Sequence, residues 1–112
     1  MTSPIVLLCT CATDAEGRRL AEALVESKLA ACVNLLPGVQ SIYRWEGAVE
    51  CAREVLMVIK STAERFEELR ARISELHSYD TPEIIALPIT AASEKYLDWM
   101  RRETADGVYP QK

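Results

Sequence analysis

The chain has 112 residues, of which 49% are hydrophobic and 27% charged, a composition typical of a single globular domain over residues 1–112. Its net charge is −4 and its basic residues are scattered, which argues against binding a row of nucleic-acid phosphates. No stretch approaches the roughly 18 apolar residues of a membrane helix, and no positively charged signal-peptide start is present. The four cysteines lack a C-x-x-C spacing. We therefore expect a cytosolic protein with reduced thiols.

The first elements follow from apolar patterning. The segment "PIVLLCTC" (Pro4 to Cys11) is a short apolar run, typical of a strand buried on both faces. The following "TDAE" (Thr13 to Glu16) matches a capping box and predicts a helix to about Lys28 or Leu29.

The stretch "ACVNLLPGVQSIYRWEGAVECAREVLMVIKS" predicts a long hairpin. Glu46–Gly47 forms its turn, because glycine supplies the positive φ that a tight turn requires. This turn places Trp45 opposite Ala48, and Pro37–Gly38 predicts a bulge or bend in the first strand. We expect Asn34 to hydrogen-bond near that bend, since a polar side chain inside an apolar strand needs a partner.

A second helix, a strand and a last helix complete the chain. "STAE" (Ser61 to Glu64) matches another capping box, and Glu68 and Arg72 are spaced as an ion pair on the helix that follows. "EIIALPI" after Pro82 predicts a strand, and "SEKYLDWMRRE" from Ser93 predicts the last helix. The second helix carries one apolar stripe: Phe66, Leu69, Ile73 and Leu76.

The order β–α–β–β–α–β–α indicates an α+β fold, a ferredoxin-like split βαβ sandwich with an additional C-terminal helix. Right-handed crossovers place both main helices on one face of the four-stranded sheet. The strands are apolar on both faces, so the second face needs cover, and an exposed apolar face of that size usually marks a subunit interface. We expect an oligomer, most simply a trimer.

Three segments carry a family resemblance: "KLAACVNLLPGVQSIYRWEG", "EVLMVIKST" and "LHSYDTPEIIALPI". From about Val6 to Arg102 the chain resembles the CutA family, the divalent-cation tolerance proteins. The resemblance implies a ferredoxin-like subunit, a homotrimer similar to the PII-type signalling trimers, and a link with copper and other divalent metals. Family members commonly carry His-Pro-Tyr after the second helix, whereas Ser78 stands in the place of the proline here.

Alignment by motif places the metal-associated positions of the family on His77 and Cys9. A neutral imidazole binds copper or zinc, but a histidine at a helix end can also serve only as a C-terminal cap. Cys9 and Cys11 share one strand face and could offer soft thiolate ligands, although free cysteine more often packs as a small hydrophobe. Both interpretations remain open for His77 and for Cys9.

A further set of residues could line an inter-subunit cleft that binds a small anion or metal. Aromatic residues near a hairpin tip can equally be packing or subunit contacts, and a lysine that ends a strand usually extends to solvent. The candidates are Tyr43, Trp45, Glu54, Lys60, Tyr79 and Glu83.

No nucleotide-binding, zincin or serine-hydrolase motif is present, and a single histidine gives no support for a Ser–His–Asp relay, so we do not expect an enzyme. The sequence favours a homotrimer that binds a divalent metal, with copper(II) favoured, and no organic cofactor. The alternative is a PII-like small-ligand sensor or a trimeric interaction scaffold, on which metal binding is adventitious.

Overall fold

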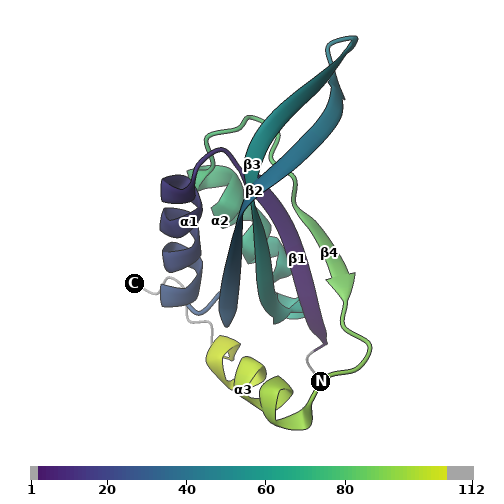
Figure 1. Cartoon of the computed structure of the whole chain (residues 1–112). Coiled ribbons are helices and arrows are strands. Elements are labelled where there is room, and N and C mark those ends of the chain that lie inside the picture. Colours follow the sequence, from purple (N-terminus) through teal and green to yellow (C-terminus); the bar gives the residue numbers. More distant parts are fainter. Residues whose placement is uncertain (1–2, 106–112) are drawn as a thin grey trace.

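A computed structural model describes residues 3–105 of the chain (Figure 1). The four strands pair antiparallel in the order β2-β3-β1-β4. This order and the succession of elements confirm the ferredoxin-like arrangement predicted from the sequence. The elements are β1 (Pro4–Cys11), α1 (Asp14–Glu26), β2 (Cys32–Trp45), β3 (Ala48–Thr62), the 3₁₀ turn η1 (Ala63–Arg65), α2 (Phe66–Leu76), β4 (Ile85–Pro88) and α3 (Glu94–Thr104).

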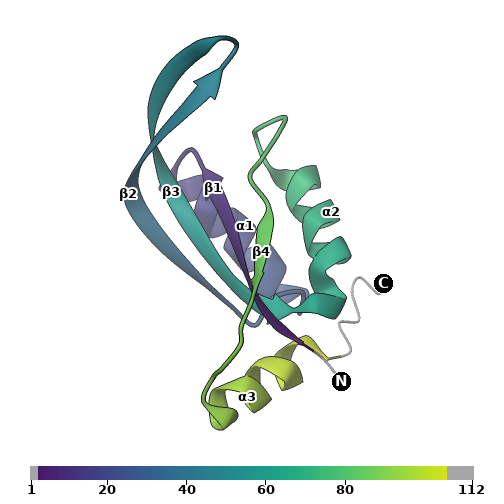
Figure 2. The ribbon, with the colours of Figure 1, turned by 90° about the vertical axis from the view of Figure 1, so that its right-hand side faces the viewer.

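Strands β2 and β3 form a hairpin that extends well beyond the other strands (Figures 1 and 2). Glu46 and Gly47 form its turn with φ values of 47° and 82°, and Trp45 lies opposite Ala48. The register shifts between Leu36 and Val39, so the predicted bulge at Pro37–Gly38 is confirmed.

The core lies between one face of the sheet and the two longer helices. Alternate strand residues point into this layer, where Leu20 and Leu24 of α1 and Leu69 and Ile73 of α2 cover them. The strand residues of the core include Ile5, Leu7, Cys9, Cys11, Val55, Met57 and Ile59, all of which are buried.

The opposite face of the sheet, which we call the open face, is apolar and only partly covered. Helix α3 lies across the end of the sheet at which β1 begins (Figures 1 and 2). Leu36, Ile85 and Leu87 expose 43%, 49% and 47% of their surface in the single chain. The exposed apolar face expected from the two-sided strand pattern is therefore present. The open face comprises Val6, Leu8, Leu36, Leu56, Val58, Ile85 and Leu87.

The start of α2 differs from the prediction. Ser61 and Thr62 belong to β3, and α2 begins only at Phe66, after the 3₁₀ turn. The Ser61 hydroxyl donates instead to the carbonyl of Leu29, 2.6 Å away. The capping box predicted at Ser61 is therefore wrong, because a contact 32 residues away along the chain takes up the hydroxyl.

Two predicted local contacts are also replaced. Glu68 accepts from Arg65 at 2.7 Å, and Arg72 donates to Glu75 at 2.8 Å. Asn34 does not bond near the bulge; its Oδ1 accepts from Nζ of Lys60 on the neighbouring strand. Within residues 3–105, no helix is long and apolar enough to span a bilayer.

Candidate functional site

His77 ends helix α2. Its backbone N–H donates to the carbonyl of Ile73 at 2.8 Å, and its ψ of 145° turns the chain out of the helix. His77 therefore occupies the C-cap position of α2 through its backbone. Its side chain has a separate set of contacts.

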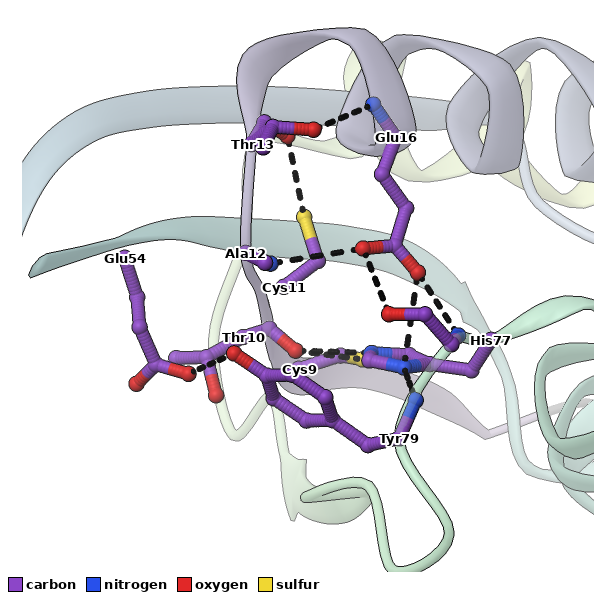
Figure 3. A network of polar contacts seen from close by, with 10 residues as sticks. Cys9, Thr10, Cys11, Ala12, Thr13, Glu16, Glu54, His77 and Tyr79 are labelled. Atoms are coloured by element: carbon purple, nitrogen blue, oxygen red, sulfur yellow. Dashed lines mark hydrogen bonds and ion pairs between the residues drawn. The ribbon is translucent and has the colours of Figure 1, made fainter. Parts of the chain in front are cut away.

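The imidazole of His77 is buried, and both ring nitrogens have partners (Figure 3). Nε2 lies 2.8 Å from the carbonyl oxygen of Thr10 in β1, and Nδ1 lies 3.0 Å from the backbone nitrogen of Tyr79. A carbonyl can only accept and a backbone N–H can only donate, so Nε2 carries the proton and Nδ1 the lone pair. The ring is thus a neutral imidazole in a fixed tautomer.

Glu16 reaches this ring from the first turn of α1. Thr13 caps the helix, since its Oγ1 accepts from the N–H of Glu16 at 3.1 Å. The Glu16 carboxylate accepts from the backbone N–H of Ser78 at 2.8 Å, from the Ser78 hydroxyl at 3.0 Å and from the N–H of Ala12 at 3.4 Å. Its Oε2 lies 3.6 Å from Nδ1 of His77.

These contacts keep Glu16 ionised. Burial by itself would raise the pKa of Glu16, because desolvation disfavours the carboxylate. The two hydrogen bonds from Ser78 and the one from Ala12 outweigh burial, and the pKa lies below its ordinary value. The site therefore holds a carboxylate beside the His77 imidazole.

Tyr79 connects the same loop to the hairpin. Its hydroxyl donates to Oε2 of Glu54 at 2.6 Å, and its ring lies 4.7 Å from that of His77, centroid to centroid. Burial, followed by the hydrogen bond to Glu54, raises the pKa of Tyr79, so the phenol stays protonated. The loop after α2 thus bridges α1, β1 and β3 (Figure 3).

Cys9 and Cys11 lie on the core side of β1 and are fully buried. Burial, with the added effect of neighbouring carboxylates including Glu16 and Glu54, raises the pKa of Cys9 to about 12 and that of Cys11 to about 11. Glu83 also raises the pKa of Cys9 electrostatically. In this conformation a Cys9 thiolate ligand would form only against these effects.

The other candidates lie apart from His77 within one chain. Lys60 pairs with Val6 on β1. Val6 lies four residues before Thr10, the residue that contacts His77, and this separation is about 13 Å along the strand. Its Nζ contacts Asn34 and lies 3.9 Å from Sγ of Cys32. Tyr43 and Trp45 lie near the hairpin tip, exposed by 43% and 53%. The single chain therefore brings together His77, Tyr79 and Glu54, and leaves Lys60 and the two hairpin aromatics elsewhere.

The sequence interpretation missed Glu16, Ser78 and the carbonyl of Thr10 as members of the site. Glu16 could be recognised only as a capping-box residue, because its partner Ser78 is 62 residues away along the chain. Within residues 3–105, no three His, Cys, Asp or Glu side chains are grouped as metal ligands. The described residues thus supply at most a sparse site, centred on one imidazole and one carboxylate.

Comparison with known proteins identifies the family. Residues 5–103 match the model of the CutA1 divalent ion tolerance protein family. The "Divalent-cation tolerance protein CutA" of Thermus thermophilus is 48% identical over 99 residues, which cover 88% of this chain and 96% of that protein. The "Protein CutA, chloroplastic" of Arabidopsis thaliana is 45% identical over 100 residues, 89% of this chain and 55% of the longer plant protein.

Solved structures agree with this match. The divalent cation tolerance protein (Cut A1) of Thermus thermophilus superposes with a TM-score of 0.89 at 46% identity, over 90% of this chain and 98% of its own. The CutA1 structure from Oryza sativa gives 0.89 at 41% identity, over 91% and 94%. The chain therefore belongs to the CutA1 divalent ion tolerance family.

Proposed function

We propose that this protein binds a divalent cation through Nδ1 of His77 and that this binding is its part in divalent-cation tolerance. The observation that carries the proposal is the fixed tautomer. Histidines that bind metals commonly donate their second ring N–H to a carbonyl or carboxylate, and Nε2 of His77 donates to the carbonyl of Thr10. The lone pair of Nδ1 accepts from the N–H of Tyr79, so a bound metal would have to displace this donor.

The affinity of such a site follows general rules. The affinity of a site with one imidazole and oxygen ligands for divalent first-row metals is highest for copper(II). Affinity alone therefore favours copper. A site with few protein ligands exchanges its metal with solvent, as a tolerance or sensing role requires, rather than locking it into the fold. The role is one of binding, and the proposal rests on His77 rather than on Cys9, because the Cys9 thiol is buried and burial raises its pKa.

The proposed active form is a homotrimer. The open face carries half-exposed leucine and isoleucine side chains on two edge strands, β2 and β4, and the single chain leaves them uncovered. Burying these side chains against further copies of the chain would remove a large apolar area from water. A light-scattering mass of one chain at micromolar concentration would contradict this part of the proposal.

A calorimetric titration with copper(II) and zinc tests the proposal. The reduced wild-type protein should bind saturably, and His77→Gln should not. Glutamine can still donate to the Thr10 carbonyl with its amide but lacks Nδ1, so this variant separates loss of the ligand from loss of the buried hydrogen bond. Circular dichroism and light scattering should confirm that both proteins are folded and of equal mass. Wild-type affinity in a folded His77→Gln protein would refute the proposal.

A second function, a PII-like sensor or interaction scaffold, is favoured by the hairpin. Large apolar side chains are exposed on this hairpin: Ile42 by 72%, Val49 by 68% and Trp45 by 53%. Exposed apolar side chains that lie together often mark a surface that binds a partner. An intact oligomer that binds neither metal would support this function instead.

A further inference from the structure

A second cluster of polar side chains lies apart from His77, where β2 begins. Cys32 and Lys60 are direct partners in the register of β2 and β3. Nζ of Lys60 lies 3.9 Å from Sγ of Cys32, and its ammonium donates to the sulfur. Lys60 is itself oriented, because Nζ also donates to Oδ1 of Asn34. The fold therefore places an amine against a thiol on two neighbouring strands.

Tyr96 of helix α3 contacts the same sulfur. Burial, followed by the negative charge that Cys32 would carry as a thiolate and a hydrogen bond with Cys32, raises the pKa of Tyr96. The phenol is thus protonated and donates to the sulfur. Two donors from different elements, Lys60 of β3 and Tyr96 of α3, therefore meet at Cys32, and both stabilise negative charge on its sulfur.

The surroundings of Cys32 differ from those of the other three cysteines. Cys9 and Cys11 are fully buried, and burial raises the pKa of both thiols. Cys51 is exposed on the hairpin, but its partner across the strands is Ile42 rather than a lysine. Reactive cysteines are partly exposed and lie beside a cation, because the thiolate is the nucleophile. Cys32 is only partly buried and has the Lys60 ammonium at its sulfur, so it meets both conditions.

We propose that hydrogen peroxide oxidises Cys32 and that Lys60 then captures the product, which forms a covalent S–N bond, a sulfenamide, between β2 and β3. In the first step the thiolate sulfur attacks one oxygen of the peroxide. An S–O bond forms, the O–O bond breaks, and two electrons pass from sulfur to the peroxide. The hydroxide that leaves takes a proton from the Lys60 ammonium and becomes water. Cys32 is then a sulfenic acid, and Lys60 is a neutral amine beside it.

The second step needs no further oxidant. The lone pair of the Lys60 nitrogen attacks the sulfenic sulfur, so that an N–S bond forms and the S–O bond breaks. The departing hydroxide takes the proton that the nitrogen releases and becomes a second water. The flexible four-carbon stem of Lys60 lets Nζ close the remaining distance from the opposite strand. An excess of a small thiol such as dithiothreitol reverses the bond, because two thiols return two electrons and restore Cys32 and Lys60.

The cross-link changes the end of the sheet at which β2 begins. It removes the positive charge of Lys60 and ties the edge strand β2 to β3. This part of the sheet thereby becomes sensitive to peroxide. The proposal does not involve His77, so it holds or fails independently of metal binding.

Mass spectrometry of the reduced full chain, treated with hydrogen peroxide while folded, tests this proposal. The wild-type chain should lose about 2 Da, and tandem spectra should join the Cys32 peptide to the Lys60 peptide. Lys60→Arg keeps the cation, but its guanidinium stays protonated and cannot attack sulfur. This variant should instead gain about 16 Da at Cys32, as a sulfenic acid that dimedone traps. Cys51→Ser is the matched control, because Cys51 is exposed and lacks the lysine, and it should form the cross-link as the wild type does.

Two results would overturn the proposal. One is a mass loss that tandem spectra assign to a disulfide of Cys32, and the other is the same mass loss in a Lys60→Arg protein that circular dichroism shows to be folded.

A measurement on the unmodified chain covers the case in which Lys60→Arg does not fold. Peroxide should oxidise Cys32 about tenfold faster than Cys51 in the folded protein, since only Cys32 has a cation at its sulfur. In concentrated urea, which separates Cys32 from Lys60 and Tyr96, the two cysteines should react at the same rate. Equal rates at Cys32 and Cys51 in the folded protein would overturn the proposal.

Discussion

Replacing Ser78 with proline should loosen the contact between helix α1 and the loop after α2. Proline has no N–H and no hydroxyl, so the substitution removes both hydrogen bonds that Ser78 donates to Glu16. The preceding residue tolerates proline, because His77 already has extended backbone angles of −74° and 145°. The effect should therefore come from the lost hydrogen bonds rather than from strain at His77.

The expected cost can be worked out from these two bonds. Hydrogen bonds to a charged group contribute about 1.5–3 kcal/mol each, and the lower end applies because Ser78 is exposed. Two such bonds give about 3 kcal/mol. Proline returns about 0.5–1 kcal/mol by restricting the unfolded chain. The free energy of unfolding should fall by about 2 kcal/mol, and Ser78→Ala should cost about 1.5 kcal/mol because it loses only the hydroxyl bond and keeps the N–H.

Urea unfolding at one fixed protein concentration, followed by circular dichroism, measures this difference. The lowered pKa of Glu16 means that its contribution is present above its ordinary pKa and is lost as pH falls through the folded-state pKa. The gap between wild type and Ser78→Pro should therefore shrink on acidification. A Ser78→Pro protein as stable as the wild type, with an unchanged pKa for Glu16 by NMR, would refute the reasoning.

Three more predictions concern the surroundings of the site. Gly17→Ala should lower the melting temperature, because the new Cβ would lie 3.2 Å from Sγ of buried Cys11. This overpacking should cost more than the roughly 1 kcal/mol that alanine gains in helix propensity. A raised melting temperature would contradict the prediction. Burial raises the pKa of Cys9 from 9.0 to about 12, so its contribution to stability is complete below pH 9.0 and is lost as pH rises through this range. In urea titrations at several alkaline pH values, the free energy of unfolding should fall less with rising pH for Cys9→Ala than for the wild type. An equal fall in both proteins would contradict this prediction. Tyr79→Phe should lower the free energy of unfolding by about 1–3 kcal/mol, because the buried Glu54 carboxylate loses its donor at 2.6 Å. In a protein that already carries Glu54→Gln, the same substitution should cost less. If the two substitutions are additive in a double-mutant cycle, the two groups do not interact.

The parts of the fold predicted correctly from the sequence depend on local chemistry. The register of the hairpin follows from Glu46–Gly47, and the bulge follows from Pro37–Gly38, because each sets backbone angles within a few residues. The start of α2 was misjudged because Ser61 has a capping pattern but hydrogen-bonds to Leu29, a contact that only the folded chain creates.

The site was predicted only in part for the same reason. His77 could be singled out as the one imidazole, and Tyr79 stands two residues away from it. Glu16 and Thr10 reach His77 through contacts across more than 60 residues of sequence, which no local pattern encodes. Lys60 has the residue type expected of a ligand-binding cleft, yet the strand register places it about 13 Å along the sheet from Thr10.

The most direct test of metal binding through Nδ1 of His77 is a long-range ¹H–¹⁵N NMR spectrum of the His77 ring with and without zinc. The chain has one histidine, so its two ring nitrogens give the only imidazole signals. We expect a protonated Nε2 and an unprotonated Nδ1 in the free protein, with zinc shifting the Nδ1 signal and leaving Nε2 bound to its proton. A metal-induced shift at Nε2, or no shift at either nitrogen at saturating zinc, would contradict it.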